Sequence, residues 1–523
     1  MYILRANMKT KNIVVLGGGT AGWLTALLTR EFYPNYSITL IESTSIGILG
    51  AGEGTVSHIT HILDKLRIPV SVLIKECKAT IKTGINFVNW HGDNTSYYHH
   101  FIANYKLEHN ILDEYGFSNM LYTYMIGNDI SLDNINFMKQ LSGHCKVPFV
   151  KKNKDPNDYS DPILGLNQFG GYALHFDARL LANFFSTVGQ QQRNITRVEG
   201  TFQSAVQDEY GNIMSIMLNG ERSVPCDFIF DCSGFARLIL GGVLKEEWKS
   251  YKEHLPVDTA IPFFIDHNND VPAQTDAIAM KHGWMWKIPV QGRYGCGYVF
   301  DSDHVSHDAA LEEAEKYFGH PLTSPKVFKF NAGTHRRTLV KNCLAVGLAN
   351  GFIEPLEATA IWTTSMNLMN FLRADIINNN TPATAKIINE RYEKIDSEVL
   401  DFIYLHYLTS RADSEFWRNF KSNTKMPTSL QHRLAQWDEI PIVDHLMNGP
   451  ADNFEGSWLI VSAGCRIFDK QKFKNIADKF NYKERIGLRY QTLIDTQRQV
   501  IEECMTHKEF IEYMHFYPSF VAN

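Results

Sequence analysis

The sequence predicts an α/β fold, in which a discontinuous domain built on a parallel sheet is joined to a mostly helical module. Three observations favour this class. A glycine-rich turn lies between a buried strand and a helix near the N-terminus. Apolar strands that run into polar or glycine-containing turns recur far along the chain, near residues 231 and 350. From residue 363 to residue 523 the apolar side chains follow helical spacing.

Residues 12–16 have the composition of a buried parallel strand, and a helix is expected to follow residue 22. The turn between them has the pattern GxGxxG, whose glycines permit a tight turn and let a pyrophosphate approach the helix N-terminus. A second strand, 37–41, ends at Glu42, at the spacing expected of an acid that binds a ribose hydroxyl. The pattern predicts a dinucleotide site, whose contacts would be Gly17, Gly19, Thr20, Ala21, Gly22 and Glu42.

A second glycine-rich segment, 47–54, follows soon after Glu42 and favours FAD as the dinucleotide. Two later strands, 224–230 and 343–348, end in turns that are expected to lie beside the same cofactor. The further predicted contacts are Gly50, Ala51, Gly52, Asp231 and Gly347. Because these segments are far apart in the sequence, the FAD-binding domain is expected to be discontinuous, as in flavin monooxygenases.

We therefore predict two modules. Residues 11–86 with 166–362 would form the FAD-binding module, and residues 87–165 with 363–523 the mostly helical substrate-binding module. Within the first module, residues 172–185 have the apolar spacing of a helix packed beneath the sheet.

Composition narrows the class of protein. With 523 residues, 44% hydrophobic and 21% charged, the chain is expected to be soluble and globular. The net charge of −6 and the absence of a Lys/Arg-rich run argue against nucleic acid and anionic membranes as partners. No apolar run is long enough to span a bilayer, and no signal peptide precedes the first strand. We expect a cytoplasmic protein.

Cysteine and histidine spacing points to neither disulfides nor metal. The eight cysteines are scattered and form no CxxC pair, so free thiols are expected. The twenty histidines include no HExxH or similar ligand pattern, and no metal site is predicted.

Residues 283–289 read Gly-Trp-Met-Trp-Lys-Ile-Pro. In a strand, Trp284 and Trp286 would face the same side, and Pro289 would end the strand. The pair could simply fill a core. Alternatively, it could form a rigid apolar wall that keeps the substrate away from the flavin and a reactive intermediate away from water.

Lys82 lies among apolar and β-branched residues, 79–87, where a solvated lysine is not expected. It could be a lysine at a helix end whose ammonium reaches water. A desolvated amine, by contrast, can act as a nucleophile or as a directed hydrogen-bond donor.

Glu354 and Glu357 flank Pro355 at a second candidate site. If a helix begins after the proline, both carboxylates could do no more than cap it. The backbone amides of Thr359 and Ala360, at the same helix start, could instead bind an anion.

On these motifs the chain resembles a flavin-dependent halogenase of the tryptophan-halogenase family, from about residue 11 to at least residue 420. The resemblance rests on GxGxxG at 17–22 combined with WxWxIP at 284–289, which separates this family from the flavin monooxygenases. Supporting matches are 81–82, 87–90, 231–235, 354–359 and 408–417.

The resemblance implies a reaction. Reduced FAD from a separate flavin reductase would react with oxygen and a halide to give hypohalous acid, which would pass through a tunnel to Lys82. Lys82 would hold it by a hydrogen bond or as a haloamine. Glu357 would orient the halogenating species or take the proton of the arene. The amides of Thr359 and Ala360 match the halide site of the family.

Trp284 and Trp286 would, by the same resemblance, screen the tunnel. The chain departs from the family where Ala358 replaces the usual serine and Ala360 a frequent glycine. These changes remove a hydroxyl near the catalytic pair and add a methyl group at the halide site. We expect bromide or iodide to be used more readily than chloride.

The substrate is less defined. Candidate aromatic walls are His99, Phe101 and Trp458, and an indole, a phenol or another electron-rich arene would fit, free or carrier-bound. Two rival functions stay open: a flavin-dependent monooxygenase that hydroxylates an arene, and a flavin-binding protein without catalysis. The oligomeric state is not readable, and a homo-oligomer is possible.

Overall fold

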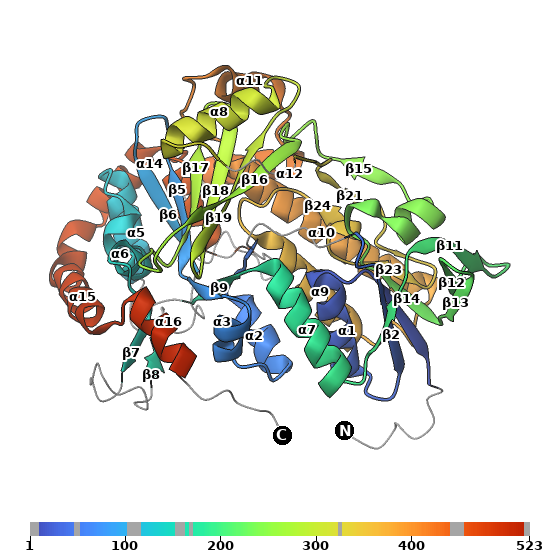
Figure 1. Ribbon diagram of the computed structural model, residues 1–523. Helices are drawn as coiled ribbons and strands as arrows, with labels where there is room; N and C mark the ends of the chain where they lie inside the picture. Colours follow the sequence, from blue (N-terminus) through green and yellow to red (C-terminus); the bar gives the residue numbers. More distant parts are fainter. Residues whose placement is uncertain are drawn as a thin grey trace.

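The structure is a computed structural model with two large sheets and an extensive helical layer (Figure 1). It describes residues 10–46, 53–101, 117–151, 163–166, 171–322, 327–439, 454 and 456–516. The α/β class with a helical module is confirmed, and strands from both halves of the chain share sheets.

The first large sheet has six strands in the order β10-β2-β1-β14-β23-β22. Their bounds are β1 (Asn12–Leu16), β2 (Ser37–Glu42), β10 (Thr196–Glu199), β14 (Phe228–Asp231), β22 (Leu339–Val340) and β23 (Cys343–Ala345). Strands β10, β2, β1, β14 and β23 are parallel, and β22 pairs antiparallel with β23. Leu16 pairs with Asp231, so the turns after β1 and β14 meet at one edge of the sheet.

Layers cover both faces of this sheet (Figure 1). Helices α1 (Thr20–Phe32), α7 (Ala178–Gln192) and α9 (Thr359–Arg373) pack together on one face. On the other face lies a small antiparallel sheet of β11 (Phe202–Gln207), β12 (Ile213–Leu218) and β13 (Arg222–Pro225). Its buried Ile213 and Ile216 pack with Val14 and Ile229 of the large sheet, so the parallel strands are apolar on both sides.

The helix expected over 172–185 was partly wrong. Residues Ala173–Phe176 form strand β9, and helix α7 begins only at Ala178. Asp177 separates the two elements, since its carboxylate accepts hydrogen bonds from the backbone amides of Arg179 and Leu180. This N-cap sets the helix start, and pairing with β4 (Thr80–Lys82) draws the preceding residues into a sheet.

The second large sheet has seven strands in the order β20-β16-β19-β18-β17-β5-β6. Their bounds are β5 (Gly84–Val88), β6 (Ser96–His100), β16 (Thr259–Asp266), β17 (Thr275–Ala279), β18 (Gly283–Val290), β19 (Arg293–Phe300) and β20 (Phe328–Lys329). Strand β18 carries both tryptophans and continues one residue past Pro289, so the proline does not end it. Pro289 pairs with Tyr294 next to the β18–β19 turn, where the ladder is about to end.

Three small sheets complete the strands. Strand β9 lies between β3 (Glu53–Gly54) and β4 (Thr80–Lys82). A second sheet contains β15 (Trp248–Ser250), β21 (Gly333–His335) and β24 (Gly351–Phe352). A third contains β7 (Phe149–Lys151) and β8 (Ile163–Gly165).

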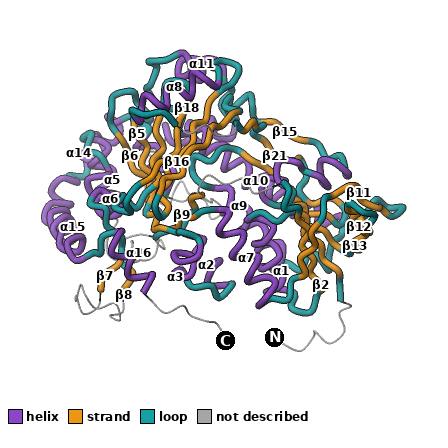
Figure 2. The backbone as a smooth tube through the Cα atoms, in the orientation of Figure 1, coloured by secondary structure: helices purple, strands orange, loops and turns teal. Residues whose placement is uncertain are grey.

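Helices form the remaining layers (Figure 2). They are α2 (His58–Lys65), α3 (Val70–Glu76), α5 (Phe117–Gly127), α6 (Phe137–Gly143), α8 (His307–Phe318), α10 (Pro382–His406), α11 (Glu415–Asn423), α12 (Thr428–Glu439), α13 (Ser457–Gly464), α14 (Lys470–Lys479), α15 (Tyr482–Glu503) and α16 (His507–Phe516), with the 3-10 turn η1 (Leu132–Ile135) beside β6. Helix α8 packs on one face of the seven-stranded sheet and helices α10 to α13 on the other. The predicted helical C-terminal region is confirmed.

The proposed module boundary at residue 86 falls inside strand β5, which pairs with β6 on one side and β17 on the other. The division into modules 11–86 with 166–362 and 87–165 with 363–523 stays a prediction. All eight cysteines are free. None of the described helices is long and apolar enough to cross a membrane.

Arg411 ties the seven-stranded sheet to the loop after α10. It is 5% exposed, and its Nη1 donates to the carbonyls of Asn89 and Ala279, at 3.0 and 2.9 Å. We predict that Arg411→Met lowers the free energy of unfolding by about 3 kcal/mol, because one buried and one partly buried carbonyl lose a charged donor.

Chemical denaturation monitored by circular dichroism measures this change. The control is Arg418→Met, where the exposed guanidinium donates, among the described residues, to the carbonyl of Ala412. Equal effects of the two substitutions would contradict the assigned role of Arg411.

Candidate functional site

The turn after β1 is built for close approach of a ligand. Gly17 has φ +125°, and a Cβ there would lie 2.2 Å from the carbonyl oxygen of Cys232. A Cβ on Gly22 would lie 1.8 Å from the carbonyl oxygen of Gly17. Above Gly19, by contrast, a Cβ would meet nothing within 4 Å, and the buried hydroxyl of Thr20 has no described hydrogen-bond partner. The N-terminus of α1 thus offers open space and a free polar group, which fits a phosphate.

Glu42 and Gly347 converge on the same turn. A Cβ on Gly18 would overlap the Oε2 atom of Glu42, so the carboxylate lies directly against the turn. Its Oε1 atom pairs with the guanidinium of Arg197. Gly347, at φ +65°, leaves no room for a side chain, since a Cβ would lie 2.8 Å from that of Ala21. The open space above Gly19, the hydroxyl of Thr20 and the carboxylate of Glu42 therefore fit the phosphate and ribose of a dinucleotide.

Asp231 is fully buried at the end of β14, and its carboxylate is occupied by the loop that follows. It accepts hydrogen bonds from the amide and hydroxyl of Ser233 and from the amides of Ile239 and Leu240, the last two at 2.9 Å. Its side chain therefore shapes the turn beside α1. Gly50, Ala51 and Gly52 lie outside the described residues.

Lys82 ends strand β4 with no solvent exposure. Its ammonium donates to the carbonyl of Thr55 at 2.9 Å and lies 5.2 Å from the ring centroid of Phe101. Burial lowers the pKa of Lys82 to about 7, against the opposing charge of Glu357. An uncharged amine is therefore available near neutral pH, as a nucleophile requires.

Glu357 is buried between two histidines. Nδ1 of His99, on β6, lies 2.9 and 3.0 Å from its two carboxylate oxygens, and Nε2 of His406, on α10, lies 2.7 Å from Oε1. Burial alone would raise the pKa of Glu357, but the two histidines outweigh it and lower the pKa to about 2. Sequence reasoning missed His406, because no spacing links residues that three separate segments bring together.

Trp284 and Tyr407 hold the other carboxylate, Glu354. The indole N–H donates to Oε2 at 3.1 Å and the tyrosine hydroxyl at 2.8 Å, while Oε1 has no described partner. Burial raises the pKa of Glu354 to about 7, although both donors act against this. Trp284 is buried and Trp286 half-buried, with ring centroids 6.3 Å apart on the same face of β18. Trp284 is thus a hydrogen-bond donor as well as a wall.

The helix-capping alternative for the two glutamates is wrong. Helix α9 begins at Thr359 after Ala358, which has φ 55°, and no side chain caps it. Both carboxylates turn instead toward donors from β6, β18 and α10. Thr359 and Ala360 border a cavity of about 40 Å³ together with Glu354.

The aromatic candidates are in two places. Phe101 lies over Lys82. His99 packs edge-on against Phe402 with centroids 5.7 Å apart, and Trp458 packs against the same ring at 5.0 Å. Trp458 is 1% exposed and belongs to the apolar cluster of α10 to α13. Phe402 therefore separates His99 from Trp458.

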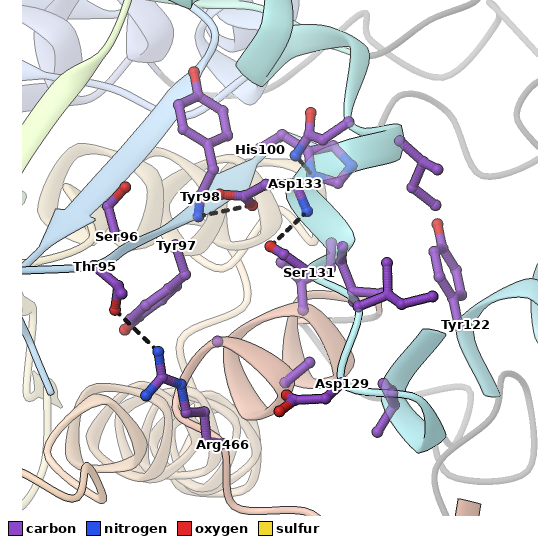
Figure 3. Close-up of a pocket in the computed structure, with 18 of the residues that line it drawn as sticks. Thr95, Ser96, Tyr97, Tyr98, His100, Tyr122, Asp129, Ser131, Asp133 and Arg466 are labelled. Carbon is purple, nitrogen blue, oxygen red and sulfur yellow. Dashed lines mark hydrogen bonds between the residues drawn. The ribbon is translucent and has the colours of Figure 1, made fainter. Parts of the chain in front are cut away.

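A larger cavity, of about 560 Å³, borders β6, η1, α5 and α13 (Figure 3). In it the amide of Tyr98 donates to Asp133 at 3.1 Å, and Arg466 donates to the hydroxyl of Thr95 at 3.0 Å. Burial raises the pKa of Asp133 to about 6. Lys82, Glu354 and Glu357 do not border this cavity, so the reactive groups do not lie in the larger of the two cavities.

Comparison with known proteins identifies the family. The sequence profile of the tryptophan halogenase family matches residues 12–481. The chain is 29% identical to the tryptophan 7-halogenase RebH of Lentzea aerocolonigenes, over 97% of this chain and 99% of RebH. It is 30% identical to the tryptophan 7-halogenase KtzQ of Kutzneria sp. (strain 744), over 79% of each chain.

Solved structures show the same fold. The flavin-dependent halogenase BrvH of Brevundimonas sp. BAL3 superposes with a TM-score of 0.81 at 25% identity, over 97% of this chain and 99% of BrvH. The tryptophan 6-halogenase SttH of Streptomyces toxytricini gives 0.82 at 25% identity, over 96% of this chain and all of SttH. The chain therefore belongs to the tryptophan halogenase family and is an enzyme of the flavin-dependent halogenase class.

Proposed function

We propose that this enzyme uses FADH2, O2 and a halide to halogenate an electron-rich aromatic, indole-like or phenolic, with hypohalous acid passing through an internal tunnel to Lys82. The observation that carries the proposal is a fully buried lysine whose pKa is lowered to about 7. The FAD, when bound, supplies the oxidation of the halide. A separate flavin reductase would deliver it in reduced form, in the cytoplasm.

Lys82 would receive the oxidised halogen on Nζ. Its hydrogen bond to the carbonyl of Thr55 fixes the direction of the amine, and burial excludes competing water. Glu357 would take the proton that the arene loses on substitution, since its carboxylate is ionised and carries two N–H donors that fix its position. Phe101, above Lys82, would form one wall for the aromatic ring, with His99 and Trp458 as further candidate walls.

The other candidate residues would bind the halide, line the tunnel or contact the cofactor. Thr359 and Ala360 would bind the halide at the start of α9, and Trp284 and Trp286 would screen the tunnel. We retain Gly17, Gly19, Thr20, Ala21, Gly22, Glu42, Asp231 and Gly347 as the proposed cofactor contacts among the described residues.

A reductase-coupled assay tests the reaction. Products from a panel of indoles and phenols, each with chloride, bromide or iodide, would be read by mass spectrometry. We expect a halogen mass shift in wild type and at least a 100-fold loss in Lys82→Met, because no amine remains to hold the halogen. Lys139→Met is the control, since this half-buried lysine donates to the side chain of Asn86 at 2.9 Å and borders neither Glu357 nor Thr55. A halide-independent gain of oxygen in both variants would favour the monooxygenase instead.

Halide preference gives a second test. We propose that bromide or iodide is used faster than chloride, because chloride loses the most hydration energy on entering a cavity that the methyl group of Ala360 makes drier. Ala360→Gly should raise the chloride-to-bromide rate ratio severalfold. The control is Ala383→Gly, which makes the same change at the second residue of another helix, α10, and is not among the described residues bordering that cavity. Steady-state rates for chloride that equal or exceed those for bromide in wild type would refute the preference.

The lowered pKa of Lys82 also predicts a pH-dependent cost in stability. Between about pH 7 and the usual lysine pKa, the unfolded chain binds a proton that the folded one does not, so the free energy of unfolding increases as the pH rises. Below pH 7 the buried lysine is charged, and the full cost of burying that charge lowers the free energy of unfolding. Lys82→Met should therefore raise Tm most at pH 6 to 7 and least near pH 10. Thermal unfolding across this range measures it, and a pH-independent difference would show that Lys82 keeps its ordinary pKa.

A further inference from the structure

The carboxylate of Glu357 is hydrogen-bonded to histidines and not to the lysine. Among the described residues, its hydrogen bonds come from His99 and His406, and none joins it to Lys82. All four side chains are buried, with exposures of 0 to 6%. In such a site, each proton on a ring nitrogen changes the charge that the lysine experiences.

Both ring nitrogens of His406 face acceptors. Nδ1 lies 2.7 Å from the carbonyl oxygen of Phe402, which can only accept, so Nδ1 carries a proton. Nε2 lies 2.7 Å from Oε1 of Glu357, and an ionised carboxylate likewise only accepts. With Glu357 ionised, both nitrogens face groups that only accept, so the hydrogen-bond geometry of this ring, which has no solvent exposure, is that of an imidazolium. His99 needs only its Nδ1 proton to donate to the same carboxylate.

We propose that His406 is a positioning residue for the reaction at Lys82: held as an imidazolium, it cancels the charge of Glu357 and so lets Lys82 lose its proton near neutral pH. The part of this role that concerns halogen transfer at Lys82 rests on the proposed function. The part that concerns the charge of Lys82 can be measured without it.

The other groups facing Lys82 supply no negative charge. Thr55 offers a neutral carbonyl and Phe101 a ring. On β9, burial and then the charge of Lys82 hold the pKa of His175 well below its usual value. On α16, His507 accepts from the amide of Ile81 through Nε2, and burial lowers its pKa to about 4, so it is neutral. Glu357 is thus the one described carboxylate that acts on the lysine, and His406 neutralises it.

An uncharged Lys82 favours one of the two ways in which it could hold the halogen. The nitrogen lone pair attacks the halogen of hypohalous acid, the N–halogen bond forms, and the O–halogen bond breaks. The displaced hydroxide takes the ammonium proton and leaves as water. The haloamine then passes the halogen to the arene, which gives its proton to Glu357. Glu357 passes that proton on to the nitrogen of Lys82, which the departing halogen would otherwise leave as an amide anion, and the neutral amine is restored. An ammonium has no lone pair for the first step.

The test measures the charge of Lys82 directly. In protein labelled with ¹³C-lysine, the Cε resonance that disappears in Lys82→Met belongs to Lys82, and its shift is followed with pH. We expect a midpoint near pH 7 in wild type. In His406→Gln, which keeps an amide donor for Glu357 but no charge, the midpoint should rise by at least about one pH unit, a tenfold fall in the ratio of amine to ammonium at any given pH.

The matched control is His91→Gln. His91 is also buried, but its ring hydrogen-bonds to Gly464 and Ser410 rather than to Glu357, so the midpoint should not move. An unchanged midpoint in His406→Gln would overturn the proposal.

If His406→Gln does not fold, ¹⁵N-histidine spectra of wild type at pH 8 replace it. Two protonated ring nitrogens on His406 would support the imidazolium, and one unprotonated nitrogen would overturn it. Neither measurement needs turnover. Absence of any halogenated product in the coupled assay would therefore count against the proposed function alone, and the charge of Lys82 would still be decided.

Discussion

The desolvation of Lys82 is the constraint on which the rest of the site depends. A buried ammonium is unfavourable unless charge or hydrogen bonds compensate, and here one carbonyl and one ring are its described contacts. The small sheet of β3, β9 and β4 holds the residue in the space between the two large sheets. The strap 354–358 then brings Glu357 near it, while the histidines of β6 and α10 hold that carboxylate.

Trp284 illustrates how a sequence signature acquires physical meaning. The paired tryptophans suggested an apolar wall, and they do share one face of β18. The indole N–H of Trp284 also donates to Glu354, at the beginning of the strap that carries Glu357. A phenylalanine would fill similar space but leave the carboxylate with one donor fewer. The strand thus supports the strap by a hydrogen bond as well as by packing.

Local features were predictable and long-range ones were not. The strand, turn and helix around Gly17 and the position of Glu42 follow from steric rules that act within about thirty residues. The start of α7 was misjudged because pairing with β4 overrode helical periodicity in residues 173–176. His406 could not be found, since only the tertiary fold brings it to Glu357. The roles of Lys82 and Glu357 came from family resemblance, and the structure adds their burial and partners.

Glu42 bears on how the proposed cofactor site is held ready. Its Oε1 atom is paired with Arg197, which also binds Glu199 at 2.8 Å, while its Oε2 atom lies against the glycine turn. A ribose hydroxyl at this site could donate to Oε2 without displacing the guanidinium. The arginine would then hold the carboxylate in one orientation before and after the cofactor binds, so the acid would lose little rotational freedom when the cofactor arrives.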